Sequence, residues 1–589
     1  MIFDESKKRN IVLGINDEHD AGCALIIDGQ LIAAYSEERF SRKKMHNGAS
    51  DGLPFESLKN ILADFDIKPA DIDYVAYNFP GAFYLMKQIY KDLWKQKCKN
   101  WWLSGFFAKT FYGVGDYIYP VFDVWRKSFK LNKLLKRFGI DKKKVVRVDH
   151  HVAHAASAYY TSELQNVLVL TLDAHGSGLS GSVSIGSGPH LLRKAVLSKY
   201  NSVGLLYSII TKGLGFRPMR HEGKILGLAA FGNPEVFYEK FKDAIECSGL
   251  DIDFKLMRKY PSPIYPHFMS LKYIFGKEFE PWYGGQRENL SAALQKRTEE
   301  VVHEWTLNAV REFGCRDLAV AGGVFSNVKV NQRLQESPEV NSLHVFPAMT
   351  DCGLPVGSAL YVYYQKFDPG KNITRFPNTY LGKDFSEKEI INVLDRLGIK
   401  YTYHDDIEEE IAKLLYNDKV VARYNSRAEY GPRALGNRSI LYSGKDREVN
   451  KWLNQKLDRT EFMPFAPSTL HEDAPLYYRK VDVSRVRQPA SFMTVTFQCT
   501  DKMKKDCPAA VHVDNTARPQ LIHKEDNPSY YKIISEYKKL SGSSTIVNTS
   551  FNAHEEPIVN SPKDAVRCFL ITRLDALAIS NYLILKKDV

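Results

Sequence analysis

The sequence predicts an α/β protein with two domains, on three observations. A strand, a polar turn and a second strand occur twice in the first half of the chain, at 11–34 and at 167–185. Residues 367–380 break regular structure, and helix start signals and a strand follow them. The 589 residues also exceed the roughly 250–300 at which a single hydrophobic core stops growing.

The first repeat is interpreted as a strand at 11–15, a polar turn at 16–22, and strands at 23–28 and 31–34. Asp28 and Gly29 separate the last two runs, and an Asp-Gly pair between apolar runs is typical of a β-hairpin. We therefore expect three strands here, joined by a polar turn and a tight turn.

The second repeat has an apolar strand at 167–172, a polar turn rich in glycine and serine at 173–181, and a strand at 182–185. Two such units indicate a duplicated domain with a cleft between its halves, as in actin, sugar kinases and Hsp70. Because Asp-Gly hairpins are common, an unrelated pair of hairpins is the alternative.

A third glycine turn ends an apolar run at Gly322 and Gly323, just before a predicted helix. Glycines at such a turn let the backbone approach a ligand closely. A plain connection from strand to helix is the alternative.

The C-terminal part has mixed α and β character. Ser386 and Glu389 form a capping box before a helix at 390–397, a second helix is expected at 407–415, and a strand at 420–424.

The composition describes an enzyme-sized soluble protein, and its cysteines fit a reducing compartment such as the cytoplasm best. The eight cysteines form no CxxC pair, so they indicate neither a disulfide framework nor a thiolate zinc site. The apolar run 11–15 is too short for a secretion signal, and no run of about twenty apolar residues indicates a transmembrane helix.

Much of the formal charge of +12 lies between 87 and 144, where lysines and arginines alternate with tryptophans and phenylalanines. This insertion is interpreted as an amphipathic helical cover, with its aromatic residues inward and its lysines solvated. Contact with an anionic membrane surface is the less favoured interpretation. No recognised nucleic-acid module accompanies the charge, so nucleic acid is not expected as a partner.

His150 and His154 are four residues apart in a segment of helix-forming composition. Residues at i and i+4 share a helix face, so both imidazoles can reach one ion. Asp173 and Asp351, with His19 in the first turn, accompany them. Two imidazoles and two carboxylates suit Fe(II), Mn(II) or Zn(II). A pair of hydrogen-bonded histidines is the alternative.

At this point the sequence resembles a family, the nodulation-protein and cephamycin-type O-carbamoyltransferases, over nearly its whole length. The resemblance is carried by HDA, EERF, HHVAH, GGVFSN, GPRALGNRS, PFAP and VNTSFN, at 19–21, 37–40, 150–154, 322–327, 431–439, 464–467 and 547–552. It implies a duplicated ASKHA (actin/Hsp70-like) domain at 1–366, a linker at 367–380 and a YrdC-like α/β domain at 381–589.

The resemblance implies a reaction in two steps. Carbamoyl phosphate and ATP give carbamoyl-adenylate, and the carbamoyl group then passes to a hydroxyl of a small-molecule or glycan acceptor with release of AMP. The metal ligands would be His150, His154, Asp173 and Asp351, holding Fe(II), with Mn and Zn as alternatives. His19 would take the acceptor's proton. Contacts to the nucleotide, supplied as Mg-ATP, are assigned to Lys44, Gly176, Lys224, Gly322, Gly323 and Asn327.

In the second domain, the resemblance assigns carbamoyl phosphate and ATP to cationic and polar side chains, for which arginine offers bidentate phosphate contact. They are Arg433, Arg438, Lys456, Arg459, Arg518, Asn548, Ser550 and Asn552. The chain departs from the family pattern at Thr460, where an acid is usual, and at Met463, where an arginine is usual.

Two other functions compete with this one. An actin-like sugar kinase would share the hairpins, but it explains neither the histidines nor the arginines. A tRNA-modifying threonylcarbamoyl enzyme would account for the positive charge. The acceptor is left open among antibiotics, lipo-oligosaccharides, capsular sugars and toxins.

Overall fold

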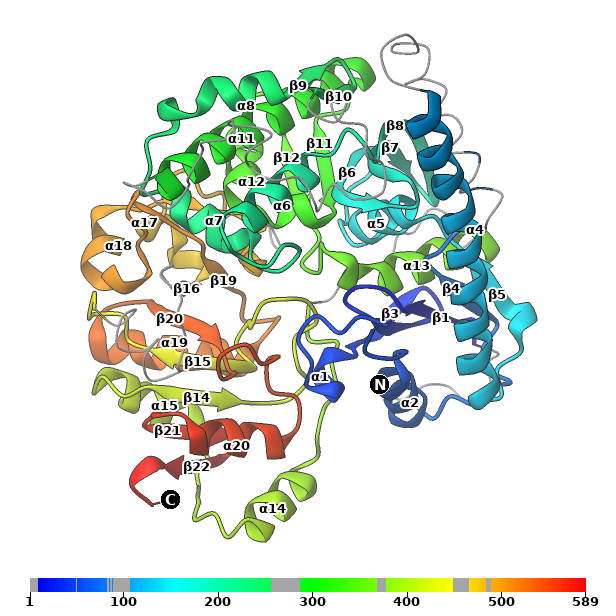
Figure 1. The fold of residues 1–589 in the computed structure, drawn as a ribbon. Helices are drawn as coiled ribbons and strands as arrows, with labels where there is room; N and C mark the ends of the chain where they lie inside the picture. Colours follow the sequence, from blue (N-terminus) through cyan, green and yellow to red (C-terminus); the bar gives the residue numbers. More distant parts are fainter. Residues whose placement is uncertain are drawn as a thin grey trace. The chain divides into compact units, whose positions relative to one another are not determined.

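The structure is a computed structural model that describes residues 9–48, 50–81, 84, 87, 106–255, 286–367, 378–448, 465–483 and 489–588, with side chains of the helix at 106–137 from 122 onward. The chain forms two compact units (Figure 1). Unit 1 comprises residues 1–32 and 47–376, and unit 2 comprises residues 33–46 and 377–589. Most of the predicted linker, residues 368–377, lies outside the described residues.

Unit 1 contains two five-stranded sheets with one topology. The first has the order β3-β2-β1-β4-β5, and the second has the order β12-β11-β6-β7-β8. In each, the first strand pairs antiparallel with the second and parallel with the fourth. The strands are β1 (Ile11–Asn16), β2 (Gly22–Ile27), β3 (Gln30–Ser36), β4 (Tyr74–Tyr77), β5 (Val145–Arg147), β6 (Val167–Gly176), β7 (Leu179–Ser187), β8 (His190–Ser198), β11 (Asp317–Ala321) and β12 (Ser342–Val345). The two sheets therefore share one strand order, as the repeated hairpins predicted.

The turn of the second hairpin is shorter than expected. Residues 173–181 were predicted as a polar turn, but β6 continues to Gly176 and β7 begins at Leu179. A register shift between Leu172 and Gly176 accommodates the extra residues. Such an irregularity redirects side chains while the two strands stay paired.

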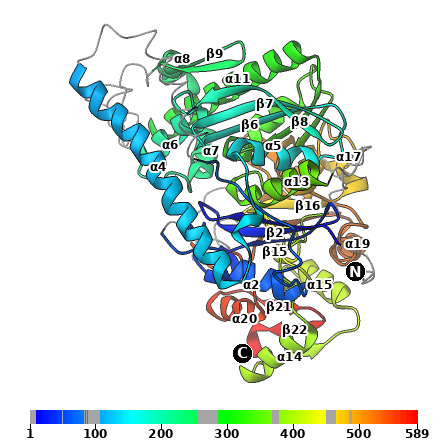
Figure 2. The ribbon, with the colours of Figure 1, turned by 90° about the vertical axis from the view of Figure 1, so that its right-hand side faces the viewer.

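Each half of unit 1 ends in a helix that packs on the sheet of the other half. Helix α5 (His150–Tyr160) follows β5 and packs on β6 and β11, whereas α13 (Leu354–Lys366) follows β12 and packs on β1, β2 and β4. Both helices lie between the two sheets (Figures 1 and 2). They approach so closely that a Cβ on Gly357 would lie 1.8 Å from the carbonyl oxygen of Ala153.

The remaining elements of unit 1 cover its edges and the outer faces of the sheets. In the described residues they are α2 (Phe55–Asp64), η1 (Lys142–Lys144), α6 (Val203–Gly213), α7 (Glu222–Ala229), η2 (Pro234–Val236), α8 (Tyr238–Ala244), α11 (Gln286–Phe313), η4 (Gly323–Ser326), α12 (Val328–Gln335), η5 (Asp351–Gly353) and the hairpin of β9 (Ile245–Ser248) and β10 (Asp251–Phe254). The buried Trp305 ties α11 to that hairpin, because its Nε1 donates to the carbonyl of Leu250.

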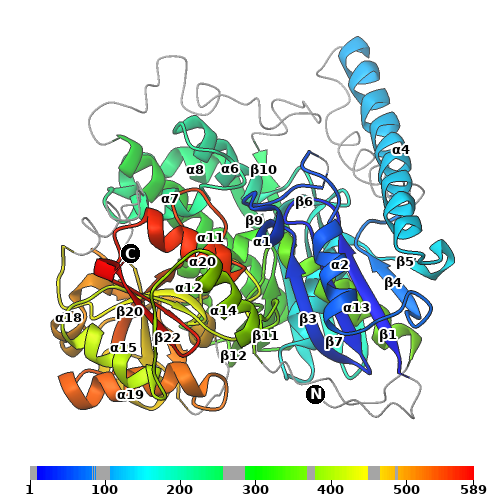
Figure 3. The same ribbon diagram turned by 90° about the horizontal axis from the view of Figure 1, so that it is seen from below.

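The predicted insertion contains a long helix, α4 (Phe106–Arg137), which Figures 2 and 3 show at the edge of unit 1. The expectation that its aromatic residues face inward is wrong for those described. Phe122, Trp125 and Phe129 are 57%, 65% and 63% exposed. The inward face is instead aliphatic, with Leu131 and Leu135 buried. Residues 88–105 lie outside the described part.

Unit 2 is built on an eight-stranded sheet of order β13-β22-β21-β14-β15-β20-β16-β19, most of whose strands are labelled in Figure 1. These strands are β13 (Thr402–Tyr403), β14 (Val421–Tyr424), β15 (Arg438–Tyr442), β16 (Ala466–Leu470), β19 (Gln520–Ile522), β20 (Thr545–Ser550), β21 (Ala576–Ile579) and β22 (Tyr582–Leu585). Strands β17 (Phe497–Gln498) and β18 (Thr516–Ala517) form a separate pair.

Helices cover both faces of this sheet. Val421 of β14 packs in one core with α15 and α19, and Ala422 packs in another with α14 and α20. The helical elements described are α1 (Glu38–Ser41), α14 (Glu387–Arg396), α15 (Ile407–Tyr416), η6 (His471–Asp473), α17 (Ala474–Tyr477), η7 (Pro489–Phe492), α18 (Asp501–Asp506), η8 (Pro508–Ala510), α19 (Pro528–Ser541), α20 (Pro562–Ile571) and η9 (Lys586–Asp588). The mixed α/β class, the capping box of Ser386 and Glu389, both predicted helices and the strand that follows them are confirmed.

Residues 33–46 belong to unit 2, although they are far from it in sequence. The backbone N–H of Ala34 donates to the carbonyl of Leu381 at 3.0 Å. The buried guanidinium of Arg39 donates to the carbonyl of Gly431, also at 3.0 Å. A single domain boundary in the chain cannot assign this segment to unit 2, because residues 47–376 separate it from the rest of that unit. No helix in the described part of the chain has the length and apolar character needed to cross a membrane.

Candidate metal centre

His150 and His154 lie in the first turns of α5, where the preceding residue fixes the start of the helix. The carboxylate of Asp149 accepts a hydrogen bond from the backbone N–H of Val152 at 3.0 Å, which caps the helix. Arg193 donates to the same oxygen at 2.7 Å and orients the cap. Both imidazoles are buried.

Two carboxylates approach these imidazoles from other elements. Asp173 comes from β6, and Asp351 from η5 at the start of α13. Oδ2 of Asp173 lies 3.3 Å from Nε2 of both histidines. Oδ1 of Asp351 lies 3.6 Å from Nε2 of His150 and 3.4 Å from Nε2 of His154. The structure thus brings together all four ligands that the resemblance implied.

The four donors fit a divalent metal ion. One ligand atom from each residue lies within 4.8 Å of the others. Nε2 of His154 is buried without a hydrogen-bond partner, although both carboxylates lie beside it. Burying such a nitrogen is unfavourable unless something binds it. Two imidazole nitrogens with two carboxylate oxygens are a donor set used by first-row transition metals.

The charged groups of the cluster shift one another's pKa values. Burial lowers the pKa of His150, but the carboxylates of Asp351 and Asp173 outweigh it and raise that pKa to about 9. Burial raises the pKa of Asp173, but the imidazoles of His150 and His154 hold it well below its usual value. The pKa of Asp351 is raised, chiefly by burial. The carboxylates thus create a negative potential at the buried imidazoles, which favours a bound cation, either a proton or a metal ion.

His19 lies in the turn between β1 and β2, beside Asp20. Its Nδ1 is 3.4 Å from Oδ2 of Asp20. Burial lowers the pKa of His19, but the hydrogen bond to Asp20 and the charges of Asp20, Asp351 and Asp173 raise it to about 9. The carboxylates of the cluster thus act on His19 electrostatically.

Asn16 links this turn to the cluster and was not predicted as a site residue. Its buried side-chain amide donates to the carbonyl oxygens of His19 at 2.8 Å and of Asp351 at 3.2 Å. The one available signal was a polar residue that directly follows the apolar run 11–15.

Three of the glycines assigned to nucleotide binding line the cluster or the turn beside it. A Cβ on Gly176 would lie 2.2 Å from the imidazole of His150, and one on Gly323 would lie 3.0 Å from Oδ1 of Asp173. Gly322 has φ +105° and would bring a Cβ within 2.2 Å of the carbonyl oxygen of Leu172. These positions need glycine to let the cluster's side chains and backbone pack.

The other nucleotide candidates lie in different elements. Lys224 is in α7, and Lys44 is an exposed residue of unit 2. The side-chain oxygen of Asn327 accepts from the backbone N–H groups of Lys329 and Val330, and its amide donates to Gln295 at 2.8 Å. Asn327 is therefore engaged as the cap of α12.

In unit 2, the polar candidates lie on neighbouring strands. Asn548 and Ser550 are in β20, which pairs with β15, and the amide of the buried Asn548 donates to Gln520 at 2.9 Å. The amide of Asn552 donates to two carbonyl groups of the loop after β20. Arg433 and Arg518 are partly buried in loops. Lys456 and Arg459, with Thr460 and Met463, lie outside the described residues.

Arg438 is held in a structural arrangement. It is fully buried, and its guanidinium donates to the carbonyl oxygens of Asn425 at 2.6 Å and Ser426 at 2.8 Å. The same group lies 3.6 Å above the ring of Tyr424. Both terminal nitrogens already have partners, so we do not carry Arg438 into the proposed phosphate site.

Glu429 organises the loop that contains Arg433, and no sequence signal had marked it. One oxygen of this buried carboxylate accepts the backbone N–H groups of Leu435 at 2.8 Å, Asn437 at 2.7 Å and Arg438 at 3.1 Å. Three N–H groups on one carboxylate oxygen fix the course of 435–438.

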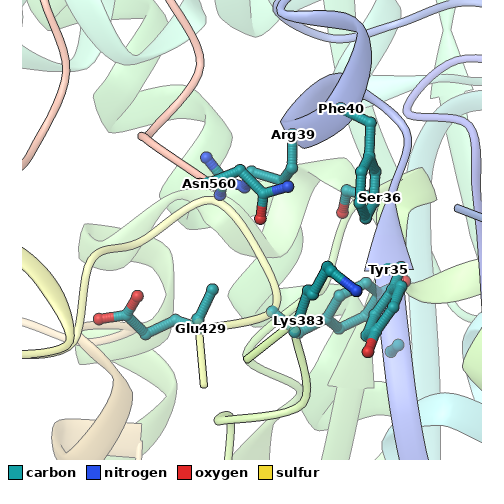
Figure 4. A pocket seen from close by; sticks show the side chains of 11 residues that line it. Tyr35, Ser36, Arg39, Phe40, Lys383, Glu429 and Asn560 are labelled. Carbon is teal, nitrogen blue, oxygen red and sulfur yellow. The ribbon is translucent and has the colours of Figure 1, made fainter. Parts of the chain in front are cut away.

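A small pocket of unit 2 lies beside Glu429 (Figure 4). Its volume of about 10 Å³ is close to the lower limit for a single water molecule, so it is not a substrate site. Its lining includes the labelled side chains Tyr35, Ser36, Arg39, Phe40, Lys383, Glu429 and Asn560.

Comparison with known families accounts for most of the chain. Residues 11–360 match the family model described as "Carbamoyltransferase N-terminus", and residues 412–586 match "Carbamoyltransferase C-terminus".

Similar proteins also extend over most of the chain. Nodulation protein NolNO of Sinorhizobium fredii is 31% identical over 578 residues, which cover 97% of this chain and 79% of that protein. An uncharacterised protein of Methanocaldococcus jannaschii is 31% identical over 98% of this chain and 100% of its own length. Nodulation protein NolO of Bradyrhizobium diazoefficiens is 32% identical over 75% of this chain and 79% of its own.

Among solved structures, T. kodakarensis HypF is similar with 14% identity and a TM-score of 0.32, over 61% of this chain and 48% of that chain. So low a TM-score supports no conclusion about the fold.

Proposed function

The chain belongs to the carbamoyltransferase family and is a carbamoyltransferase, and from this premise we propose that it is an ATP-dependent O-carbamoyltransferase with carbamoyl-adenylate as its intermediate. The observation that carries the proposal is the cluster of His150, His154, Asp173 and Asp351 beside the turn of His19.

In this proposal, unit 1 is an actin-like domain that performs the transfer. Its repeated sheet topology supports this assignment, because each half contributes one hairpin and one helix start to the same place. The hairpins supply His19 and Asp173, and the helix starts supply His150 and Asp351. Unit 2 is proposed as a YrdC-like domain that makes the adenylate.

The chemistry requires a proton acceptor and a stabilised leaving group. A divalent metal ion held by the four ligands, expected to be Fe(II) with Mn or Zn as alternatives, would supply positive charge that stabilises AMP as it leaves. His19 has Nδ1 directed to Asp20, so Nε2 is the nitrogen that would take the proton of the acceptor hydroxyl. Asn16 holds that turn against Asp351.

The proposed steps balance as follows. Carbamoyl phosphate reacts with water to give carbamate and phosphate, and a carbamate oxygen attacks the α-phosphorus of ATP to release pyrophosphate. The acceptor hydroxyl then attacks the carbamoyl carbon, loses its proton to His19 and releases AMP. For the first steps, Arg433, Arg518, Lys456 and Arg459 are proposed to neutralise phosphate charge, with Asn548, Ser550 and Asn552 as polar contacts.

The test follows each step separately. The protein is incubated with Mg-ATP, labelled carbamoyl phosphate and a panel of hydroxylated acceptors, and pyrophosphate, AMP and product mass are measured. We expect His150→Ala to release pyrophosphate without a carbamate ester, and Arg518→Ala to release no pyrophosphate. The exposed residues His190 and Arg573 provide matched controls as H190A and R573A, which we expect to behave as wild type.

Three outcomes would overturn the proposal. The first is equal loss of both steps in each variant, which would contradict the division of labour. The second is formation of ADP and a phosphorylated acceptor, which would indicate a kinase. The third is salt-dependent tRNA binding with threonylcarbamoyl transfer, which would indicate a tRNA-modifying enzyme.

A further inference from the structure

Helix α4 is apolar on two opposite faces. One face packs on unit 1 through Leu131, Leu134 and Leu135, which are buried. The opposite face carries Phe122, Trp125 and Phe129, which are more than half exposed. Single exposed aromatic residues are ordinary, but three on one face of two successive turns form a patch that calls for an explanation.

The three aromatic rings form a continuous row. The ring centroids of Phe122 and Trp125 are 6.1 Å apart, and those of Trp125 and Phe129 are 6.2 Å apart with nearly parallel planes. Figures 2 and 3 show α4 as a long helix, with its N-terminal half away from the other labelled elements of unit 1. All three rings are more than half exposed, so the row is accessible to a broad, flat partner.

The same face is basic at its C-terminal end. A helix turns about 100° per residue, so Lys133 and Lys136 lie on the side of Trp125 and Phe129, and both lysines are exposed. From 122 to 137 the one acidic residue is Asp123, which pairs with Arg126 at 2.7 Å and with Lys127 at 3.1 Å. No carboxylate of this stretch is left to neutralise the two exposed lysines.

From this arrangement we propose that the face of Phe122, Trp125, Phe129, Lys133 and Lys136 docks the protein on an anionic lipid bilayer. Tryptophan and phenylalanine enter the boundary between headgroups and acyl chains, where their rings leave water. The lysine ammonium groups reach lipid phosphates, and each adds attraction to an anionic surface. The contact goes beyond the carbamoyl-transfer reaction and requires no substrate.

Charge favours a bilayer over a second copy of the chain. A parallel two-fold contact through this face would place the lysines of one copy near those of the other, and an antiparallel contact would place them against aromatic rings. Neither contact offers the lysines a carboxylate from this face, because Asp123 is already paired with Arg126 and Lys127. An anionic lipid surface instead supplies opposite charge along the whole face.

Helix α4 also makes contacts with the rest of unit 1 that would hold unit 1 in place when the helix binds a membrane. Lys127 pairs with Glu18 and lies 3.7 Å from the centroid of the Phe79 ring. Arg137 lies 3.9 Å from the centroid of the Phe55 ring. Glu18 is in the turn that holds His19, so membrane contact would place unit 1 in a defined orientation on the surface.

The test measures co-sedimentation of the full chain with vesicles of phosphatidylcholine alone and of phosphatidylcholine with phosphatidylglycerol. We expect binding to the anionic vesicles, weakened by salt, and a partition coefficient at least about tenfold lower for the double variant W125S/F129S. K133E/K136E should lower it by about tenfold or more. Phe231 is 54% exposed in the turn after α7, so F231S is the matched control and should bind as wild type.

A second readout identifies the contact residue. Brominated lipids quench the emission of tryptophans that enter the bilayer, and we expect Trp125→Phe to bind with clearly less quenching than wild type. Absence of binding to anionic vesicles would overturn the proposal. So would binding that W125S/F129S leaves unchanged, or a concentration-dependent dimer that this variant abolishes, which would assign the face to a second copy.

Discussion

Gly176 leaves no room for a side chain beside the imidazole of His150, because a Cβ there would lie 2.2 Å from the ring. We expect Gly176→Ala to displace His150, lower the metal content by at least about tenfold and abolish carbamoyl transfer. Elemental analysis and the product assay measure the two effects. Gly223 has nothing within 4 Å of a Cβ, so Gly223→Ala should keep both. Full metal loading of Gly176→Ala would contradict the packing argument.

Asp20 controls the proton affinity of His19. It raises the pKa of His19, so replacing it by asparagine should lower that pKa and increase the neutral fraction near pH 7. The acid limb of the rate profile should therefore move to lower pH in Asp20→Asn. Asparagine tolerates the φ of +55° at this position. The measurement is transfer rate against pH, and an unchanged limb would exclude His19 as the titrating base.

Replacing His19 itself should slow transfer without affecting the metal. For His19→Gln we expect a loss of about 10² to 10⁴ in the transfer rate, the usual contribution of a positioned general base. Pyrophosphate release and metal content should stay as in wild type. Loss of the metal in this variant would instead show that His19 supports the cluster.

We expect Glu429 to support stability and carbamoyl phosphate binding by fixing the loop at 435–438. Glu429→Ala leaves three buried N–H groups without their acceptor, and we expect it to lower the free energy of unfolding by roughly 3 kcal/mol. The KM for carbamoyl phosphate should rise in Glu429→Ala, because Arg433 lies in the same loop. In Glu429→Gln the KM should lie between those of wild type and Glu429→Ala. The exposed Glu525 gives the control E525A. An unaltered KM in Glu429→Ala would show that the loop is not part of the phosphate site.

His344 should make the stability depend on pH. It is buried, with Nε2 3.1 Å from the hydroxyl of Thr161, and burial lowers its pKa to about 4. The folded pKa is below the unfolded one, so its contribution is complete above about pH 6.5 and is lost as the pH falls through 4. Between pH 7 and pH 5 this loss amounts to about 2 kcal/mol. Chemical denaturation should show that the free energy of unfolding of His344→Gln falls less between pH 7 and pH 5 than that of wild type. The exposed His190→Gln should show the same fall as wild type.

Much of the candidate metal centre could be predicted from the sequence. Two histidines four apart after a capping aspartate specify one helix face, and that local rule is independent of the rest of the fold. Asp173 and Asp351 were expected from a family resemblance, because residues from distant strands and helices meet through topology alone. Asn16 was missed for the same reason: its amide acts on a carbonyl that is 335 residues away.

Some residue types have two common uses, so one expectation failed and one site residue was given a structural role instead. A guanidinium suits phosphate, but Arg438 points to backbone carbonyl groups inside unit 2. The aromatic residues of α4 suit a core, but aliphatic residues fill the inward face. Periodicity shows that a helix has an apolar face. When a helix has two apolar faces, periodicity does not show which of them packs on the protein.

The membership of residues 33–46 in unit 2 has a consequence for how the chain is synthesised. This segment leaves the ribosome before all of 47–376, and its partners at Leu381, Gly431 and Ile558 are synthesised only after that stretch. The segment therefore lacks these partners while residues 47–376 are being made. A fragment that starts after the linker would lack the hydrogen bonds that Ala34, Arg39 and Arg42 make to unit 2, and a synthetic peptide of 33–46 added in trans could restore them.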